Sequence, residues 1–214
     1  DVVSLNIAEG AKKWAERFGL KIVLFEGFKK GTKNLDDIAR KARSSGAQGL
    51  IVCGHFDEAV NMRLSLKRIK WYPKAYFASV GPTMQAFYDK LKTIADHVFS
   101  ASMWEHHSGL KVPGCSEFYE AFMKTYREEP SYHAATAYAG CQILESAIKK
   151  AGSIDREKIG VILLSMDAIN IIGRYGVDKR GMQIKHFTLI IQWQNGKKEV
   201  VWPDDLKSAE PIFR

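Results

Sequence analysis

Long apolar runs and paired cysteines are both missing from this 214-residue chain. No stretch approaches the ~18 consecutive apolar residues of a membrane-spanning helix, so we expect no membrane span. The three cysteines, Cys53, Cys115 and Cys141, form no CxxC pair, and an odd number excludes a disulfide framework. We interpret Cys53 and Cys141 as small core residues.

Motifs of common catalytic, cofactor and metal sites are missing too. The chain has no GxGxxG, Walker A, GxSxG or HExxH sequence. Gly27–Thr32 (GFKKGT) resembles a phosphate loop, but it has the wrong spacing and lacks the Lys-Ser/Thr pair. Glu105-His106-His107 suggests a metal site, yet adjacent histidines on an extended chain point to opposite sides, which favours a polar connection. We therefore expect no cofactor, no metal and no enzyme activity, with an unrecognised α/β enzyme as a minor alternative.

Charge is not concentrated in any one part of the sequence. The net charge is +8 and the pI is near 9.3, but the basic residues are scattered in pairs such as Lys12-Lys13 and Lys149-Lys150. No basic stripe carries interleaved aromatics, which favours a solvated surface over nucleic-acid binding. A composition of 46% hydrophobic and 26% charged residues is typical of a globular protein. The length suits one large or two small domains.

Short apolar runs alternate with helical patterns over the first hundred residues. This alternation predicts an α/β fold, a Rossmann-like parallel sheet with helices on both faces. The first helix is expected over Leu5–Phe18, with Ile7, Ala11, Trp14 and Phe18 on its buried face. An α/β domain normally has a strand before such a helix, so we expect a first strand to be missing here. The expected strands are Lys21–Phe25, Gly49–Cys53, Ala75–Val80 and His97–Ala101.

The rhythm changes after Met103, where a polar connection leads into three helical patterns. The second of these patterns places Ala137, Cys141 and Leu144 on one face. Asn195-Gly196, between two apolar runs, predicts a terminal β-hairpin. We divide the chain into 1–103, 104–186 and 187–214.

Two of the expected strands run into loops suited to holding a small molecule. Gly49–Cys53 is followed by Gly54, His55 and Phe56, and Ala75–Val80 is followed by Gly81, Pro82 and Thr83. Ligands of open α/β sheets bind outside the carboxyl ends of the strands. Glycine permits close backbone approach and threonine offers a hydroxyl. We expect ligand contacts at His55, Phe56, Gly81 and Thr83, although a lone histidine is more often a structural residue.

Three further residues are candidates with open alternatives. Trp104 follows a strand end and is either a pocket wall or a core residue. Tyr132 and His133 begin a helix after Pro130, where helix entry is the favoured interpretation over ligand contact.

Four stretches in order resemble the leucine/isoleucine/valine-binding family, the solute receptors of amino-acid ABC transporters. They are GAKKWAERFGLKIVLFEGF at 10–28, GLIVCGHFDEAV at 49–60, PSYHAATAYAGCQILESAIKKAG at 130–152 and IIQWQNGKKEVVWP at 190–203. The resemblance implies the type I periplasmic-binding-protein fold: two α/β lobes, three crossing strands and a ligand in the cleft. It implies that 1–103 is a second lobe without its first strand. It also implies that 104–186 is a crossing plus a helical return to the first lobe, and that 187–214 is the last crossing and tail. The opening lobe would be absent, which makes the chain an incomplete two-lobe receptor.

The resemblance also implies partners and a ligand class. A permease of the ABC transporter would be the membrane partner, and the location would be periplasmic or extracellular, with a lipid anchor allowed. His55 falls where the family often has an aromatic or polar residue in contact with the ligand. Tyr132 or His133 falls where the family has an apolar or aromatic contact to the ligand side chain. Thr83 falls near the position where classical members of the family place an acidic residue that pairs with the ligand's ammonium group. Threonine there leaves room for hydrophobic acids, amides or aromatic carboxylates besides branched-chain amino acids. The alternative is a ligand-sensing domain of a signalling receptor or regulator.

Overall fold

The computed structural model describes residues 1–106 and 111–214. The chain forms two compact units. The first comprises 1–101, 190–201 and 209–214, and the second comprises 102–189 and 202–208. His107, from the metal-site suggestion, lies outside the described residues.

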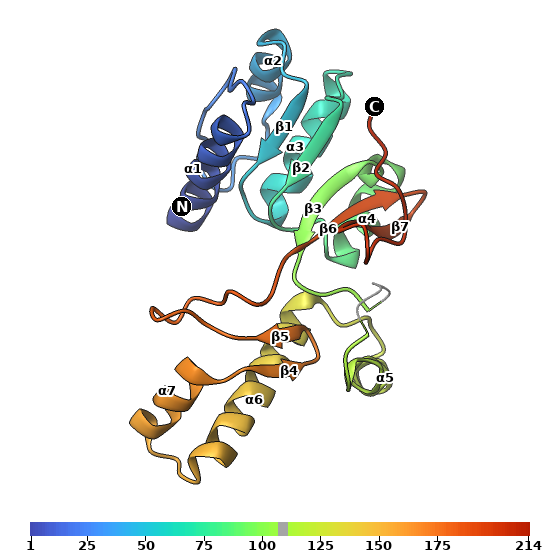
Figure 1. Cartoon of the computed structure of the whole chain (residues 1–214). Helices are drawn as coiled ribbons and strands as arrows, with labels where there is room; N and C mark the ends of the chain where they lie inside the picture. Colours follow the sequence, from blue (N-terminus) through green and yellow to red (C-terminus); the bar gives the residue numbers. More distant parts are fainter. Residues whose placement is uncertain (107–110) are drawn as a thin grey trace. The chain divides into compact units, whose positions relative to one another are not determined.

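A five-stranded sheet forms the centre of the first unit (Figure 1). β1, β2 and β3 are parallel, with Leu50 opposite Tyr76 and Phe77 opposite Phe99. This confirms the predicted α/β class. The strands lie in the order β1 (Gly49–Val52), β2 (Ala75–Ala78), β3 (Val98–Ser102), β6 (Leu189–Gln194) and β7 (Lys197–Trp202).

The terminal hairpin is also confirmed. β6 and β7 are sheet neighbours joined by Asn195 and Gly196, whose φ angles are +51° and +80°. Positive φ at both loop residues is the requirement of a tight hairpin turn, and Asn-Gly meets it at low cost.

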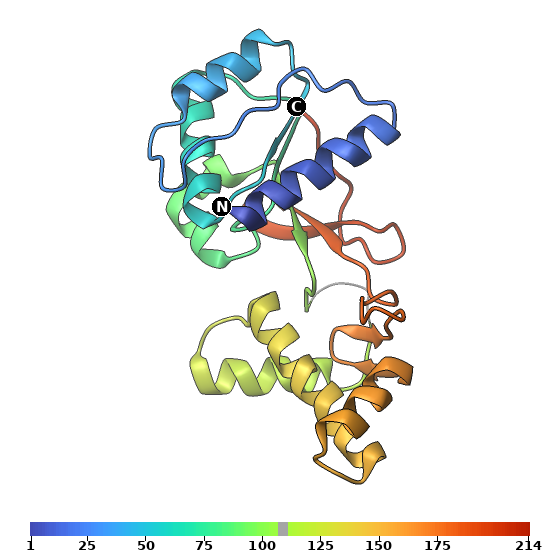
Figure 2. The same ribbon diagram turned by 90° about the vertical axis from the view of Figure 1, so that its left-hand side faces the viewer.

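Helices α2, α3 and α4 lie together on one face of this sheet (Figure 2), and α1 lies beside β1 in both views. The core under α2–α4 contains large buried side chains such as Leu66, Phe87 and Trp193. The helices are α1 (Val2–Arg17), α2 (Asp36–Ser44), α3 (Phe56–Arg68) and α4 (Gln85–Leu91), followed by a 3₁₀ turn at Lys92–Ala95.

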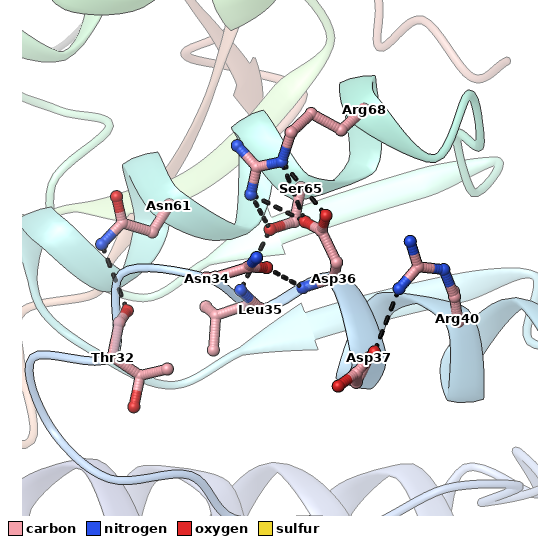
Figure 3. A network of polar contacts seen from close by, with 9 residues as sticks. All are labelled: Thr32, Asn34, Leu35, Asp36, Asp37, Arg40, Asn61, Ser65 and Arg68. Atoms are coloured by element: carbon pink, nitrogen blue, oxygen red, sulfur yellow. Dashed lines mark hydrogen bonds and ion pairs between the residues drawn. The ribbon is translucent and has the colours of Figure 1, made fainter.

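Polar contacts anchor the start of α2 on α3 (Figure 3). The Asp36 carboxylate accepts bonds from Arg68 Nη2 at 2.7 Å and Nε at 3.0 Å. Ser65 Oγ accepts from the Leu35 backbone N–H at 3.1 Å. Hydrogen bonds from Arg68 and Ser65 hold the pKa of Asp36 below its usual value. The loop before α2 is therefore held at a defined position over α3.

Two predictions for the start of the chain are wrong. Lys21–Phe25 is not a strand, because it pairs with no other strand among the described residues. The expected buried face of the first helix is mostly exposed: Ile7 is 37%, Trp14 52% and Phe18 74% exposed. Helical spacing showed which residues share a face, but it does not supply a surface for that face to pack on.

The described residues of the second unit form three helices and a small antiparallel hairpin. Its core cluster consists of Trp104, Cys115, Phe118, Ala135, Ala139 and Ile171. The elements are α5 (Cys115–Tyr126), α6 (Tyr132–Ala151), α7 (Arg156–Ser165), β4 (Ala168–Asn170) and β5 (Gly173–Tyr175). None of the described helices is long and apolar enough to cross a membrane.

The three predicted helices of this region are confirmed, but the buried face of α6 is not the predicted one. Ala135 and Ala139 are fully buried, whereas Cys141 and Leu144 are exposed. The Trp104–Phe118 cluster packs on the alanine face, since small side chains allow the helix to approach closely. The assignment of Cys141 to the core is therefore wrong, and Cys53 is only half-buried.

Candidate functional site

The loops after β1 and β2 are joined at the carboxyl edge of the first unit's sheet. The Gly54 backbone N–H donates to Ser79 Oγ at 3.2 Å, and the same hydroxyl donates to the Gly54 carbonyl at 3.0 Å. A Cβ on Gly54 would lie 2.8 Å from Glu58 Cβ, so glycine is required at this position. One serine thus positions the backbone that carries His55.

A buried carboxylate organises the start of α3. Glu58 is 4% exposed, and its Oε atoms accept bonds from the backbone N–H groups of His55 at 3.1 Å and Gly31 at 2.9 Å. Burial alone would raise the pKa of Glu58, but the backbone donors outweigh it, and the net shift is downward. The charge is thereby held close to the helix N-terminus, where a negative group is favourable.

His55 is the N-terminal cap residue of α3 and presents a half-exposed imidazole at this edge. Its side chain is 39% exposed, and Nε2 lies 3.3 Å from Asp1 Oδ2. Asp1 also caps α1 through the Ser4 backbone N–H at 3.1 Å. The imidazole is therefore oriented by a neighbouring carboxylate and still accessible to a polar group.

Phe56 turns its ring toward the core of the unit. The ring meets Phe87 edge to face, with centroids 6.4 Å apart, and Lys90 Nζ lies 5.5 Å from its centroid. Phe56 thus supports the loop from beneath by packing.

The turn after β2 is held by the terminal hairpin. Gly81 has φ +110°, and a Cβ there would lie 2.9 Å from Phe56 Cα. The Pro82 carbonyl accepts from Trp193 Nε1 at 2.6 Å, and the Thr83 carbonyl accepts from Lys198 Nζ at 2.9 Å. Thr83 itself is 4% exposed. Two side chains of the terminal hairpin therefore hold the backbone of this turn.

Trp104 belongs to the aromatic cluster of the second unit. It is 4% exposed and meets Phe118 edge to face at 5.8 Å. Within the described residues its indole N–H is buried without a hydrogen-bond partner. His106 nearby stacks on Tyr119 with centroids 3.7 Å apart. Trp104 is thus a core residue of this unit, with one donor left over.

Tyr132 and His133 begin α6 behind the cap Ser131, as the helix-entry interpretation expected. Their rings stack at 4.0 Å; Tyr132 packs against the aromatic cluster, while His133 is exposed. Burial raises the pKa of Tyr132.

The candidates therefore fall into two groups. His55, Phe56, Gly81 and Thr83 lie at one sheet edge of the first unit, and Trp104, Tyr132 and His133 belong to the second unit. Sequence reasoning missed Glu58, Ser79 and Trp193, which fix the first group. Glu58 carried a detectable signal, since an acidic residue three positions after a helix cap is typical of a capping box. Within the described ranges, no cluster of three potential metal ligands occurs.

The periplasmic binding protein family matches residues 2–198. The chain belongs to this family. The predicted resemblance is thus confirmed, and with it the type I periplasmic-binding-protein fold, of which the chain covers part.

Curated relatives are similar to this chain along nearly its whole length. A Leu/Ile/Val-binding protein homologue from Brucella melitensis is 25% identical over 217 residues, covering 96% of this chain and 53% of the relative. Another homologue, from Brucella abortus, is 24% identical and covers 94% of the chain and 52% of the relative. The chain therefore spans about half the length of the curated relatives it matches.

Solved structures show the same fold. A leucine-binding protein, LivK, from Thermotoga maritima superposes with a TM-score of 0.77 at 20% identity, covering 89% of this chain and 53% of that one. The branched-chain amino acid transporter substrate-binding protein LivJ from Streptococcus pneumoniae, in complex with isoleucine, gives a TM-score of 0.76 at 23% identity, covering 90% and 56%.

Proposed function

We propose that this chain is part of the solute-binding component of an ABC importer. Its ligand would be a hydrophobic or branched-chain amino acid, or a related small carboxylic acid or amide. The single observation that carries the proposal is the family match across residues 2–198. The structures solved with isoleucine and with leucine bound support the ligand class.

The loop edge suggests how this unit would hold a polar ligand group. His55 offers an oriented, half-exposed imidazole at this edge, beside the buried turn at Gly81. Thr83 stands near the position where family members are expected to have an acidic residue. An ammonium group of the ligand would therefore lack a carboxylate partner there. This favours ligands recognised mainly through a carboxylate or amide and an apolar body.

Hinge closure is the proposed mechanism. A ligand bound between two lobes favours the closed state by the contacts it gains only there, and the permease would recognise that state. Tyr132 and His133 are proposed to contact the apolar part of the ligand, with Trp104 as a buried member of the cluster against which Tyr132 packs. The family match supports a periplasmic or extracellular location, and a lipid anchor is part of the proposal.

A sensing role is the second candidate, because the same fold can bias a signalling partner through the same closure. Transport and sensing would use the same ligand and differ in the protein that recognises the closed state. Capture of a permease by the liganded protein favours transport, whereas capture of a kinase or DNA-binding regulator favours sensing.

Calorimetric titration of the full chain tests the ligand class. Leucine, isoleucine, valine, their amides and an aromatic acid form the panel, with arginine as a control of opposite character. We expect weak binding, with dissociation constants of about 1 mM for panel members, because the loop edge supplies only a few contacts to the ligand. The His55→Ala variant should weaken binding at least several-fold without unfolding. The neighbouring exposed variant Asp57→Asn should not change it. Equal heats for arginine and leucine, or for His55→Ala and the parent, would contradict the proposal.

A further inference from the structure

A small cavity of about 10 Å³ lies at the amino end of the first unit's sheet, opposite to the loop edge proposed to bind solute. It is lined by α3, by the residues that directly precede β2 and β3, and by Arg214. A cavity of this size holds one water-sized occupant. The polar groups and charges around the cavity indicate which occupant it would bind.

Arg63 of α3 is a buried cation beside this cavity. Its side chain is 3% exposed, and its guanidinium packs on the Tyr72 ring at 4.7 Å. Nη2 makes one long contact of 3.5 Å with the Asp96 carbonyl oxygen, whereas Nε and Nη1 are buried without a hydrogen-bond partner among the described residues. A buried charge is normally paired, because its desolvation costs more than one long contact returns. Arg63 therefore retains donors for a ligand.

His97 supplies a second buried nitrogen at the same cavity. Its backbone N–H donates to the Trp193 carbonyl oxygen at 2.7 Å, which fixes the residue directly before β3. Its Nδ1 atom is buried and has no partner in the described part of the chain. Arg63 and His97 thus come from different elements, and both present unpartnered nitrogen atoms at one cavity.

Two guanidinium groups contact one aromatic ring beside the cavity. The Arg214 guanidinium lies 4.6 Å from the centroid of the Tyr72 ring, on which Arg63 also packs. The Arg214 backbone N–H donates to the Lys74 carbonyl oxygen at 3.1 Å, which holds Arg214 in place. Burial lowers the pKa of Arg63, and the charge of Arg214 adds to this lowering. Two positive charges near one ring favour an anion beside them.

Negative charge at the cavity does not balance this excess. The acidic side chain among the described lining residues is Asp96, and its Oδ1 accepts from the Gly196 backbone N–H at 3.1 Å. Within residues 1–106 and 111–214, Arg63, His97 and Arg214 form no ion pair. The net charge around the cavity is therefore positive.

We propose that this cavity binds one small monovalent anion of the halide class, held by Arg63 and His97 with the Arg214 guanidinium nearby. The anion would accept N–H bonds from the guanidinium and from the imidazole, and it would offset the charge of both arginines. A carboxylate or a phosphate is larger than the single occupant that the cavity accommodates. Because the three side chains come from α3, the start of β3 and residues 209–214, the bound anion would fasten the last segment to the sheet.

Thermal unfolding of the full chain in four sodium salts of equal ionic strength tests this site. The salts are chloride, bromide, acetate and gluconate. An anion that binds the folded state alone stabilises it by mass action, so chloride and bromide at about 100 mM should raise the Tm by about 3 °C or more over gluconate. Acetate should give less than about a third of that gain, because it does not fit. Equal Tm values in all four salts would show that the cavity takes water only, and equal gains from acetate and chloride would show that it does not select by size. Either result would overturn the proposal.

Two arginine substitutions locate the effect. Arg63→Met removes the buried charge and its donors but keeps a side chain of similar length. This variant should be at least as stable as the parent in gluconate and should lose the gain from chloride. Arg40→Met removes an arginine whose side chain is 59% exposed in the same unit, and it should keep the full gain. A chloride gain that persists in Arg63→Met would contradict the proposed location.

The His97 imidazole provides a second readout. A bound anion favours the protonated imidazole, so chloride should raise the pKa of His97 relative to gluconate in the parent and not in Arg63→Met. An NMR titration of the imidazole measures this, and a pKa of His97 that does not respond to chloride in the parent would also overturn the proposal. The solute-binding proposal is tested separately at His55 and does not depend on this outcome.

Discussion

Trp193 Nε1 donates a 2.6 Å hydrogen bond to the carbonyl oxygen of Pro82, across 111 residues of sequence. The indole is 1% exposed and stacks on Tyr88 with centroids 4.9 Å apart. A hairpin near the end of the chain therefore determines the path of a loop after β2. The backbone that would meet a ligand is held by a residue with no role of its own in contacting it.

Removal of this donor should loosen the Gly81–Thr83 turn. Trp193→Phe keeps an aromatic ring against Tyr88 but leaves the buried Pro82 carbonyl without its partner, which costs about 1–3 kcal/mol. Chemical denaturation measures the loss, and faster amide exchange at Met84 locates it. Trp14→Phe, at a ring that is 52% exposed, should change stability by less than about 0.5 kcal/mol. An equal effect of the two substitutions would contradict this account.

Gly81 should not tolerate a side chain. Its φ of +110° and the 2.9 Å approach to Phe56 Cα both oppose a Cβ. We expect Gly81→Ala to destabilise by about 1–3 kcal/mol. Gly10→Ala, inside α1 with nothing within 4 Å, should instead stabilise by about 0.5–1 kcal/mol. Thermal unfolding of the two variants provides the comparison, and a neutral Gly81→Ala would refute the strain argument.

Glu58 should make stability depend on pH below the usual range of a glutamate. Its folded-state pKa is lowered, so its contribution is complete above the unfolded value of about 4.3 and is lost as pH falls through the folded value. Glu58→Gln replaces one acceptor by a donor facing backbone N–H groups and should cost about 1–3 kcal/mol at neutral pH. Urea titrations from pH 7 to pH 3 should converge for variant and parent. Asp57→Asn, on the exposed side of the same turn, should not show this convergence.

Arg63 is a buried cation that packs on an aromatic ring and forms no ion pair within the described part of the chain. It is 3% exposed, its guanidinium lies 4.7 Å from the Tyr72 ring, and Nε and Nη1 lack hydrogen-bond partners. Arg63→Met should therefore be neutral or stabilising by about 1 kcal/mol or more, because it removes a desolvation that the Tyr72 ring and one long bond to the Asp96 carbonyl offset only in part. Arg63→Ala should destabilise by about 2 kcal/mol or more through the cavity it leaves.

The same substitution should be visible at His97. Burial lowers the pKa of His97, and the charges of Arg214 and Arg63 lower it further against the opposing effect of Asp96. Removing the Arg63 charge should raise the pKa of His97 toward its usual value. An NMR titration of the imidazole in Arg63→Met measures this, and an unchanged titration would show that Arg63 does not act on it.

Periodicity and turn chemistry predicted much of the fold. The three parallel strands, the helices between them and the Asn195-Gly196 hairpin are local signals that survive in the structure. The prediction of a strand at Lys21–Phe25 is wrong because a strand needs a neighbouring strand to pair with as well as a suitable composition. The predicted burial of Trp14 and Phe18 is wrong for a similar reason, since an apolar helix face needs another element to pack against.

The candidate site was predictable only in part. Gly54 and Gly81 stand out because an apolar run ending in glycine is visible in sequence. The groups that hold those loops come from far along the chain: Gly31 meets Glu58 across 27 residues, and Pro82 meets Trp193 across 111. Contacts at such separations leave no periodic trace. Whether residues of the two units share one ligand stays a prediction.

The most direct test of the central claim is an NMR titration of the ¹⁵N-labelled full chain with leucine and, separately, with arginine. The account predicts leucine-dependent shifts concentrated at the amides of His55, Phe56, Gly81 and Thr83, with arginine producing none. Absence of shifts at these amides at millimolar leucine, its amide and an aromatic acid, or shifts confined elsewhere, would contradict it.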